Sequence, residues 1–259
     1  MDGSVPSEDV TVPTPEQLTK VVALDGPAGS GKSTVARLVA GALGWRFVDT
    51  GASYRAITLA VMRSGADLED QEAVATAARR ARVELVTDPA APQVFLDGTD
   101  VTREVRGEQV TALVSAVSAV PAVREVLIAL QRRTMGLSGA VVEGRDIATV
   151  VAPRAAVKVY LDARPEVRAR RRAGEVSELR AGKAAVTTDA VPARAAAETG
   201  AAQELEREVA QDLARRDSLD NQTNRLQASH GAVDLDTSDL SLDEVVAAVV
   251  ALVREAGVR

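Results

Sequence analysis

The segment from Gly26 to Ser33 limits the possible folds of this chain more than any other part of the sequence. It fits the pattern G-x-x-x-x-G-K-[ST] and follows directly on the apolar run Val21–Leu24. In such a loop the glycines let successive backbone N–H groups point at phosphate oxygens, Lys32 reaches the β- and γ-phosphates, and Ser33 ligates the accompanying Mg²⁺. The pattern predicts a strand, a phosphate-binding loop and a helix, in that order.

The residues after this loop favour a phosphate site over a chance match in an ordinary loop. A helix is predicted from about Lys32 to Leu43, because apolar residues recur there at helical spacing, at Val35, Leu38, Val39, Ala42 and Leu43. The positive end of the helix dipole would then lie at the loop. The site identifies a ligand and not a reaction.

The rest of the chain alternates short apolar runs with helical patterns, which predicts an α/β fold with a parallel sheet between layers of helices. The expected strands are Val21–Asp25, Arg46–Asp49, Ala140–Glu143, Val157–Asp162 and Ala232–Asp236. Functional loops of such sheets gather at the carboxyl ends of the strands. Asp25, Asp49–Gly51, Glu143–Asp146 and Asp162 should therefore line one crevice with the phosphate loop.

Three segments depart from the alternation. Apolar and polar residues alternate from about Val83 to Glu104, on both sides of two prolines. This pattern predicts a small antiparallel appendage. Ala173–Gln203 is rich in alanine and poor in large apolar residues, which favours a mobile surface insertion that is part of a lid. Residues 1–19 predict a disordered tail before a single domain over residues 20–259.

Composition excludes several function classes. The chain has 259 residues, no cysteine and a net charge of −6, so a disulfide framework, a thiolate metal site and broad nucleic-acid binding by overall field are all disfavoured. No apolar run approaches the roughly 20 residues that span a bilayer. We expect a monomer in the cytoplasm. Between Arg124 and Arg172, however, the sequence has ten arginines and one lysine but five acidic residues. This local excess of positive charge indicates a bound anion.

Several charged residues follow the predicted strands. Arg55 could bind a second phosphate opposite the loop, and a plain surface arginine is the alternative. Arg145 could bind phosphate while Asp146 accepts hydrogen bonds from the exocyclic amine of a base, or the two could merely pair and close a turn. Arg168, Arg171 and Arg172 share one helix face and could close over transferring phosphates, or could form a solvated surface.

The sequence points to phosphoryl transfer between phosphates. It has one histidine, His230, and no cysteine, so mechanisms that need these groups as base or nucleophile are disfavoured. A phosphate monoester with a second pKa of about 6 is already largely dianionic at neutral pH and needs no strong general base. Positioning and charge neutralisation by Lys32, Mg²⁺ and arginines would suffice.

Taken together, these motifs resemble the bacterial cytidylate kinases among the nucleoside monophosphate kinases. The similarity runs from about Val21 to the C-terminus. Its motifs are Gly26–Lys32, Asp49–Arg55, Val114–Ser118, Pro121–Arg124, Glu143–Asp146 and Arg215–Asp220. The resemblance implies transfer of the γ-phosphate of ATP to CMP or dCMP with Mg²⁺ as cofactor. It also implies a P-loop kinase sandwich with a five-stranded parallel sheet, whose core is 20–64, 121–164 and 217–259, with a monophosphate-binding insertion at 65–120 and a lid at 165–216.

The resemblance also implies roles for individual residues. The donor phosphates would be held by Gly26, Pro27, Ala28, Gly29, Ser30, Gly31, Lys32, Ser33 and Thr34, with Ser33 on the metal. The acceptor would be bound by Thr50, Arg55, Ser115, Arg124, Arg145, Asp146, Arg216, Asp220 and Arg225. Catalysis would rest on Lys32 and on the lid residues Arg168, Arg171 and Arg172.

The sequence departs from the family pattern at three places. Thr223 stands where a phosphate-binding arginine is expected, so either Arg225 supplies that contact or the contact is missing. Ala148 replaces a common glycine, a change that we expect the loop to accommodate, and the lid is longer and richer in alanine than usual. A kinase of UMP or of a small metabolite, and a noncatalytic nucleotide-binding regulator, are the alternative functions.

Overall fold

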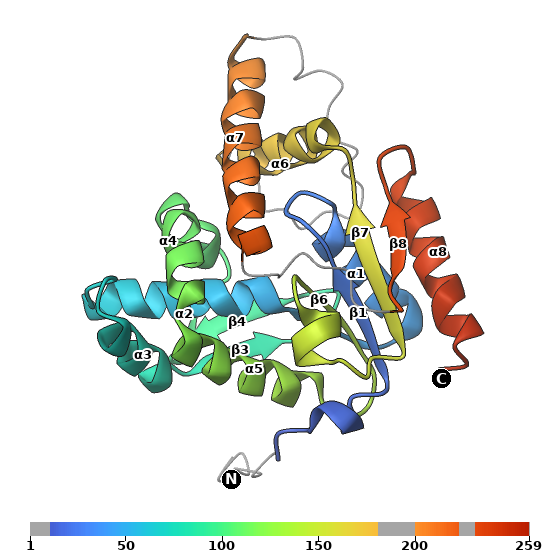
Figure 1. Cartoon of the computed structure of the whole chain (residues 1–259), viewed down its shortest axis with the longest axis horizontal. Helices are drawn as coiled ribbons and strands as arrows, with labels where there is room; N and C mark the ends of the chain where they lie inside the picture. Colours follow the sequence, from blue (N-terminus) through green and yellow to red (C-terminus); the bar gives the residue numbers. More distant parts are fainter. Residues whose placement is uncertain (1–10, 181–199, 223–230, 259) are drawn as a thin grey trace, which may run out of the picture.

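Five parallel strands form the central sheet of the computed structural model, in the order β2-β6-β1-β7-β8 (Figure 1). The structure describes residues 11–180, 200–222 and 231–258. The strands are β1 (Val21–Asp25), β2 (Arg46–Asp49), β6 (Ala140–Gly144), β7 (Val157–Asp162) and β8 (Val233–Asp236). The predicted parallel sheet is confirmed, and each strand lies within one residue of the expected position.

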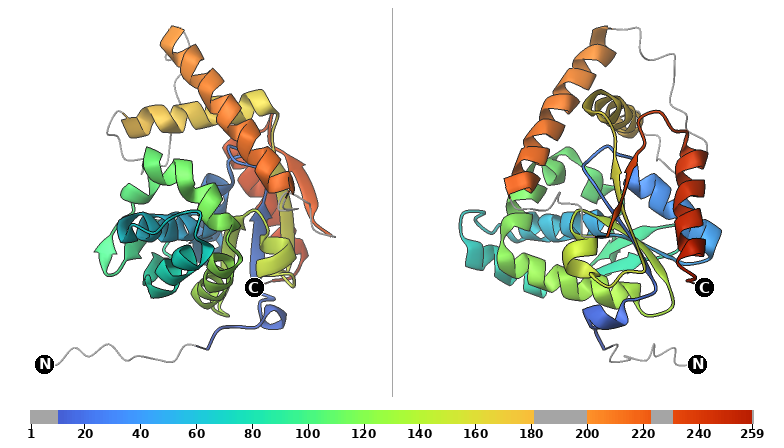
Figure 2. Two further views of the ribbon diagram at one scale, coloured as in Figure 1. Left: turned by 60° about the vertical axis from the view of Figure 1, so that its left-hand side comes forward. Right: turned by 45° about the vertical axis from the view of Figure 1, so that its right-hand side comes forward.

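The two faces of β1 bury different sets of side chains, since successive residues of a strand point to opposite sides. Val22 and Leu24 pack on a cluster with α1 (Lys32–Leu43) and α8 (Leu242–Glu255). Val21 and Ala23 pack on a second cluster with α5 (Pro121–Met135) and the helical turn η3 (Ile147–Val151). The sheet is therefore covered on both faces, which gives the three layers seen in Figure 2.

The region between α2 and α5 has a hydrophobic core of its own. Its elements are α2 (Thr50–Ser64), α3 (Gln71–Arg80), η2 (Glu104–Arg106) and α4 (Glu108–Ala119), with a small sheet of β3 (Val83–Val86), β4 (Gln93–Leu96) and β5 (Thr99–Asp100). The small sheet is antiparallel, as predicted. Ile57, Val105 and Leu127 belong to the one buried cluster that joins these elements.

The predicted tail over residues 1–19 needs correction at its end. The short helix η1 (Pro15–Gln17) is closed by a capping box between Thr14 and Gln17, and Leu18 is buried beside Met135. Thr14 is a good helix cap and Leu18 gains free energy by leaving water. These residues therefore belong to the folded domain, while residues 1–10 lie outside the described part.

The alanine-rich segment Ala173–Gln203 is also more regular than predicted. Helix α6 (Pro165–Arg180) continues through its first part, and α7 (Gly200–Gln222) begins within its last part. The two helices cross each other beyond the carboxyl ends of the strands (Figures 1 and 2) and share a small cluster of Ala169, Val209 and Leu213. Alanine, arginine and glutamate are good helix formers, which explains the helix without a large apolar face. Residues 181–199 lie outside the described part.

No single helix among the described residues is long and apolar enough to cross a membrane. One pair, α4 with α5, meets the length and composition criteria together, although the two helices are bent by 101° at their junction.

Replacing Leu127 with alanine tests the core of the α2–α5 region. Leu127 is fully buried, so we expect the Leu127→Ala variant to lose about 2 to 5 kcal/mol of unfolding free energy through the cavity that it leaves. The measurement is urea unfolding followed by circular dichroism. Leu137 is 58% exposed, so Leu137→Ala serves as the control and should change the stability by less than about 0.5 kcal/mol. Equal losses in the two variants would contradict this assignment of the core.

Candidate functional site

The phosphate loop lies between β1 and α1 and depends on glycine at two tight positions. Gly26 has φ +147°, and a Cβ there would lie 2.0 Å from the carbonyl oxygen of Leu161 in β7. Gly29 has φ +78°, and its Cβ would lie 2.8 Å from the carbonyl oxygen of Arg168 in α6. The loop can therefore pass beneath α6 only because these residues lack side chains.

Lys32 is buried within the loop that it serves. Its Nζ donates to the carbonyl oxygen of Pro27 at 2.6 Å and lies 3.5 Å from Oγ of Ser30. Burial lowers the pKa of the ammonium, while the nearby Glu143 opposes that shift. The loop thus holds a positive charge close to the N-terminus of α1, where an anion is also favoured by the helix dipole.

Ser33 and Glu143 are adjacent oxygen donors at the ends of α1 and β6. The hydroxyl of Ser33 donates to Oε1 of Glu143 at 2.7 Å. Burial and the neighbouring Asp49 carboxylate raise the pKa of Glu143. Hydroxyl and carboxylate oxygens are ligands that Mg²⁺ accepts, and Mg²⁺ usually completes its shell with phosphates and water. The donor set therefore fits the expected metal.

Asp25 connects the strand of the phosphate loop to the turn after β6. Its two carboxylate oxygens accept the backbone N–H groups of Ile147 and Ala148, each at 2.8 Å. Burial raises the pKa of Asp25 from 3.8 to about 6, although both hydrogen bonds favour the charged form. Ala148 lies in the turn η3 and is not among the residues with positive φ, so alanine is accommodated there as expected.

One cleft of about 230 Å³ brings most of the predicted site residues together. Those that line it are Ala28, Gly29, Gly31, Lys32, Ser33, Thr34, Thr50, Arg55, Ser115, Arg124, Arg145, Asp146, Arg172 and Arg216. The donor loop and the acceptor residues therefore face the same space. Asp220 falls in the last turns of α7, and Thr223 and Arg225 lie outside the described residues.

Arg55 is held in the cleft by uncharged groups. Its Nη1 donates to Oγ1 of Thr111 at 2.7 Å and to the carbonyl oxygen of Val105 at 3.3 Å. Burial, together with the fields of Arg172 and Arg216, lowers the pKa of Arg55 to about 10. A buried guanidinium in a positive field is stabilised when an anion binds beside it. The geometry favours a phosphate site over a plain surface arginine.

Asp146 pairs with Arg124, which comes from α5. Nη2 of Arg124 donates to Oδ2 of Asp146, and Nη1 of Arg124 lies 3.4 Å from the hydroxyl oxygen of Tyr54. The hydroxyl of Thr50 donates to the carbonyl oxygen of Glu143 at 2.7 Å, which fixes the start of α2 against β6. The carboxylate and the guanidinium of this pair both line the cleft, so both can meet a base.

The three arginines of α6 have different surroundings. Arg168 donates to the carbonyl oxygen of Ala28 at 3.2 Å and to Asp217 at 2.6 Å. Arg171 donates to the carbonyl oxygen of Ser30 at 3.3 Å and to Oγ1 of Thr237 at 2.9 Å. Arg172 is the one of the three that lines the cleft. The first two therefore hold the phosphate loop, whereas Arg172 pairs at the cleft with Glu175.

The sequence did not single out several residues of the cleft, among them Tyr54, Arg106 and Glu175. Arg106 ends the turn η2 and pairs with Asp49 at 3.2 Å. No motif surrounds it, and its place in the cleft follows from the packing of the α2–α5 region. Glu143 and Asp49 were predicted to lie here, because both stand at the carboxyl ends of neighbouring strands, and both line the cleft.

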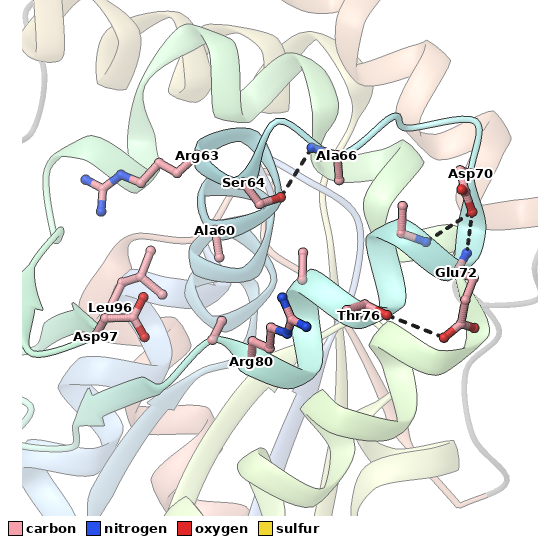
Figure 3. A pocket seen from close by; sticks show the side chains of 13 residues that line it. Ala60, Arg63, Ser64, Ala66, Asp70, Glu72, Thr76, Arg80, Leu96 and Asp97 are labelled. Carbon is pink, nitrogen blue, oxygen red and sulfur yellow. Dashed lines mark hydrogen bonds between the residues drawn. The ribbon is translucent and has the colours of Figure 1, made fainter.

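A larger hollow of about 610 Å³ lies elsewhere, between α2, α3 and the β4–β5 turn (Figure 3). None of its lining residues belongs to the cleft. Polar side chains of the hollow form hydrogen bonds with nearby backbone groups. Asp70, for example, caps α3 by accepting the N–H groups of Glu72 and Ala73. The hollow therefore offers no set of converging polar groups.

Comparison with known proteins identifies the same family along almost the whole chain. The family model described as cytidylate kinase matches residues 22–194 and 183–255. A cytidylate kinase of Rhodococcus opacus is 46% identical over 91% of this chain and 95% of its own length. Cytidylate kinases of Streptomyces avermitilis and Caldanaerobacter subterraneus are 43% and 41% identical, over 91% and 92% of this chain and 93% and 96% of their own lengths.

The raised pKa of Asp25 leads to a pH-dependent stability. The folded protein holds the Asp25 proton more tightly than the unfolded chain, so this group favours folding increasingly as the pH falls from about 7 to about 4. Asparagine in Asp25→Asn cannot take up that proton. Urea unfolding at the two pH values should show the wild type gaining free energy of unfolding relative to the variant at the lower pH. A constant difference would contradict the raised pKa.

Proposed function

The chain belongs to the cytidylate kinase family, and on that basis we propose how its cleft binds and orients two nucleotides. The enzyme transfers the γ-phosphate of ATP to CMP or dCMP, which gives ADP and CDP or dCDP. The observation that carries the proposal is the single cleft in which the phosphate loop faces Arg55, Arg124 and Arg145. A cleft with two phosphate-ready sides suits transfer between two phosphorylated molecules.

The donor side is the phosphate loop with Lys32 and Ser33. The backbone N–H groups from Gly29 to Thr34 would hold the donor phosphates, and Lys32 would exchange its contact with Pro27 for phosphate oxygens. Ser33, supported by Glu143, would hold Mg²⁺. When bound, Mg²⁺ neutralises charge on the donor phosphates.

The acceptor side combines arginines with a carboxylate. Arg55 and Arg145 would bind the acceptor phosphate, while Asp146, oriented by Arg124, would accept a hydrogen bond from the exocyclic amine of cytosine. Thr50 and Ser115 would contact the base. Arg216 and Asp220 would meet the sugar and phosphate, and Arg225 is the proposed further phosphate ligand. An amine donor distinguishes cytosine from uracil, so Asp146 supports CMP over UMP.

Transfer needs no strong base from the protein. The acceptor phosphate, with a second pKa of about 6, is already a nucleophile at neutral pH. The residues of the cleft would orient this nucleophile and neutralise charge as it develops. Arg172 would contact the transferring group from α6, and the contacts of Arg168 and Arg171 support an indirect role in which they fix the loop.

We also infer that the enzyme works as a monomer in the cytoplasm. One chain supplies both sides of the cleft. The absence of cysteine from the sequence fits a reducing compartment.

Acceptor choice is tested by measuring ADP release with CMP, dCMP, UMP and AMP at equal concentrations. We expect CMP or dCMP to be the best acceptor. Turnover with UMP or AMP far above that with CMP would instead support a different monophosphate kinase. Binding of ATP and CMP without any CDP formation would support a noncatalytic nucleotide-binding regulator.

Replacing Lys32 tests the donor side. Lys32→Ala removes the charge that stabilises the transferring phosphoryl group, so kcat should fall by roughly 100-fold or more with the fold retained. Coupled measurement of ADP release gives kcat, and circular dichroism reports the fold. Lys20→Ala is the control, because Lys20 precedes β1 and lies over the Trp45 ring at 5.4 Å. Similar turnover in both variants would exclude the proposed role of Lys32.

A further inference from the structure

Thr111 on α4 is the point at which two arginines of the cleft meet. Its Oγ1 accepts Nη1 of Arg55 from α2 at 2.7 Å. Its carbonyl oxygen accepts Nη2 of Arg216 from α7 at 3.3 Å. These helices are far apart in the sequence, and each contacts α4 in the fold (Figure 1). One residue therefore contacts both guanidinium groups.

Thr111 itself does not line the cleft, whereas Arg55 and Arg216 do. Its hydroxyl can reach a bound nucleotide only through the arginines that it holds. We propose that Thr111 is a positioning residue that sets Arg55, and with it Arg216, in place for the acceptor phosphate. This inference rests on the proposed function.

The chemistry of the contact matters as much as its position. Thr111 and Val105 offer Arg55 two uncharged oxygens, so the contacts orient the guanidinium without cancelling its charge. Arg124 differs, because it is paired with the Asp146 carboxylate. A neutral acceptor leaves Arg55 with a net charge for the dianionic phosphate, and a rigid guanidinium loses less entropy when it binds.

A substitution of Thr111 can remove its contact to Arg55 without removing its contact to Arg216. Arg216 uses the main-chain carbonyl of Thr111, which every substitution at this position retains. Its charge is also balanced by Asp212, with Nε of Arg216 at 2.9 Å from Oδ2. Replacing the threonine side chain therefore removes the contact to Arg55 and keeps the contact to Arg216.

The experiment compares Thr111→Val with Thr111→Ser in the full-length enzyme. Valine keeps the shape and removes the acceptor, so we expect KM for CMP to rise about tenfold, while KM for ATP changes by less than about twofold. Serine keeps the hydroxyl and should restore KM for CMP to within about twofold of the wild type. Thr111→Ala is a second variant that lacks the acceptor and should behave like valine.

The matched control is Thr102→Val. The hydroxyl of Thr102 accepts the backbone N–H of Val94 at 2.9 Å in the same region, away from the cleft. It should lower the stability without changing KM for CMP. An equal rise of KM in Thr102→Val and Thr111→Val, or no recovery with serine, would overturn the positioning role.

A double-mutant cycle tests whether Thr111 acts through Arg55. In an Arg55→Ala background, Thr111→Val should change KM for CMP by less than about twofold, because its partner is already absent. A full tenfold effect in that background would overturn the inference. Wild-type enzyme that does not phosphorylate CMP would overturn the proposed function and this inference together. An active wild type with an unchanged Thr111→Val variant would overturn this inference alone.

Discussion

Two hydrogen bonds to the buried carboxylate of Asp25 join the halves of this enzyme's site. Asp25 ends the strand that leads into the phosphate loop, and the N–H groups that it accepts belong to the turn directly after Arg145 and Asp146. The parallel pairing of β1 with β6 places both loops at the same edge of the sheet, with Asp25 opposite Gly144. The distance between donor and acceptor is thus set inside the sheet, where the backbone is least mobile.

The charged residues on the donor and acceptor sides of the cleft differ in their hydrogen-bond partners. Lys32 and Ser33, the proposed ligands of the donor phosphates and of the metal, have close partners in Pro27 and Glu143. Arg55 has uncharged partners, which leaves its charge available. A buried charge without a counter-charge costs folding free energy, and in the proposed mechanism a bound phosphate offsets that cost.

The parts of the fold that were predicted correctly are those with a local signal. The strands and the phosphate loop follow from apolar runs and glycine spacing, which act over a few residues. The burial of Leu18 and the position of Arg106 in the cleft depend on packing with distant segments, so no local sequence pattern predicts them. The start of α6 was predicted with its arginines on one helix face. The continuation of α6 to Arg180 and the whole of α7 were missed, because their helix-forming residues have no apolar stripe and the pattern then resembles a surface loop.

The hydrogen bond of Lys32 within its own loop has a consequence for nucleotide binding and release. Its ammonium already has an acceptor in the carbonyl of Pro27. In the proposed mechanism, donor binding is then an exchange of hydrogen bonds at Lys32 and not a net gain of them, which moderates ground-state affinity. Release of ADP reverses that exchange and leaves no buried ammonium without an acceptor. The Lys32 ammonium would thus have a hydrogen-bond acceptor both before the nucleotide binds and after it leaves.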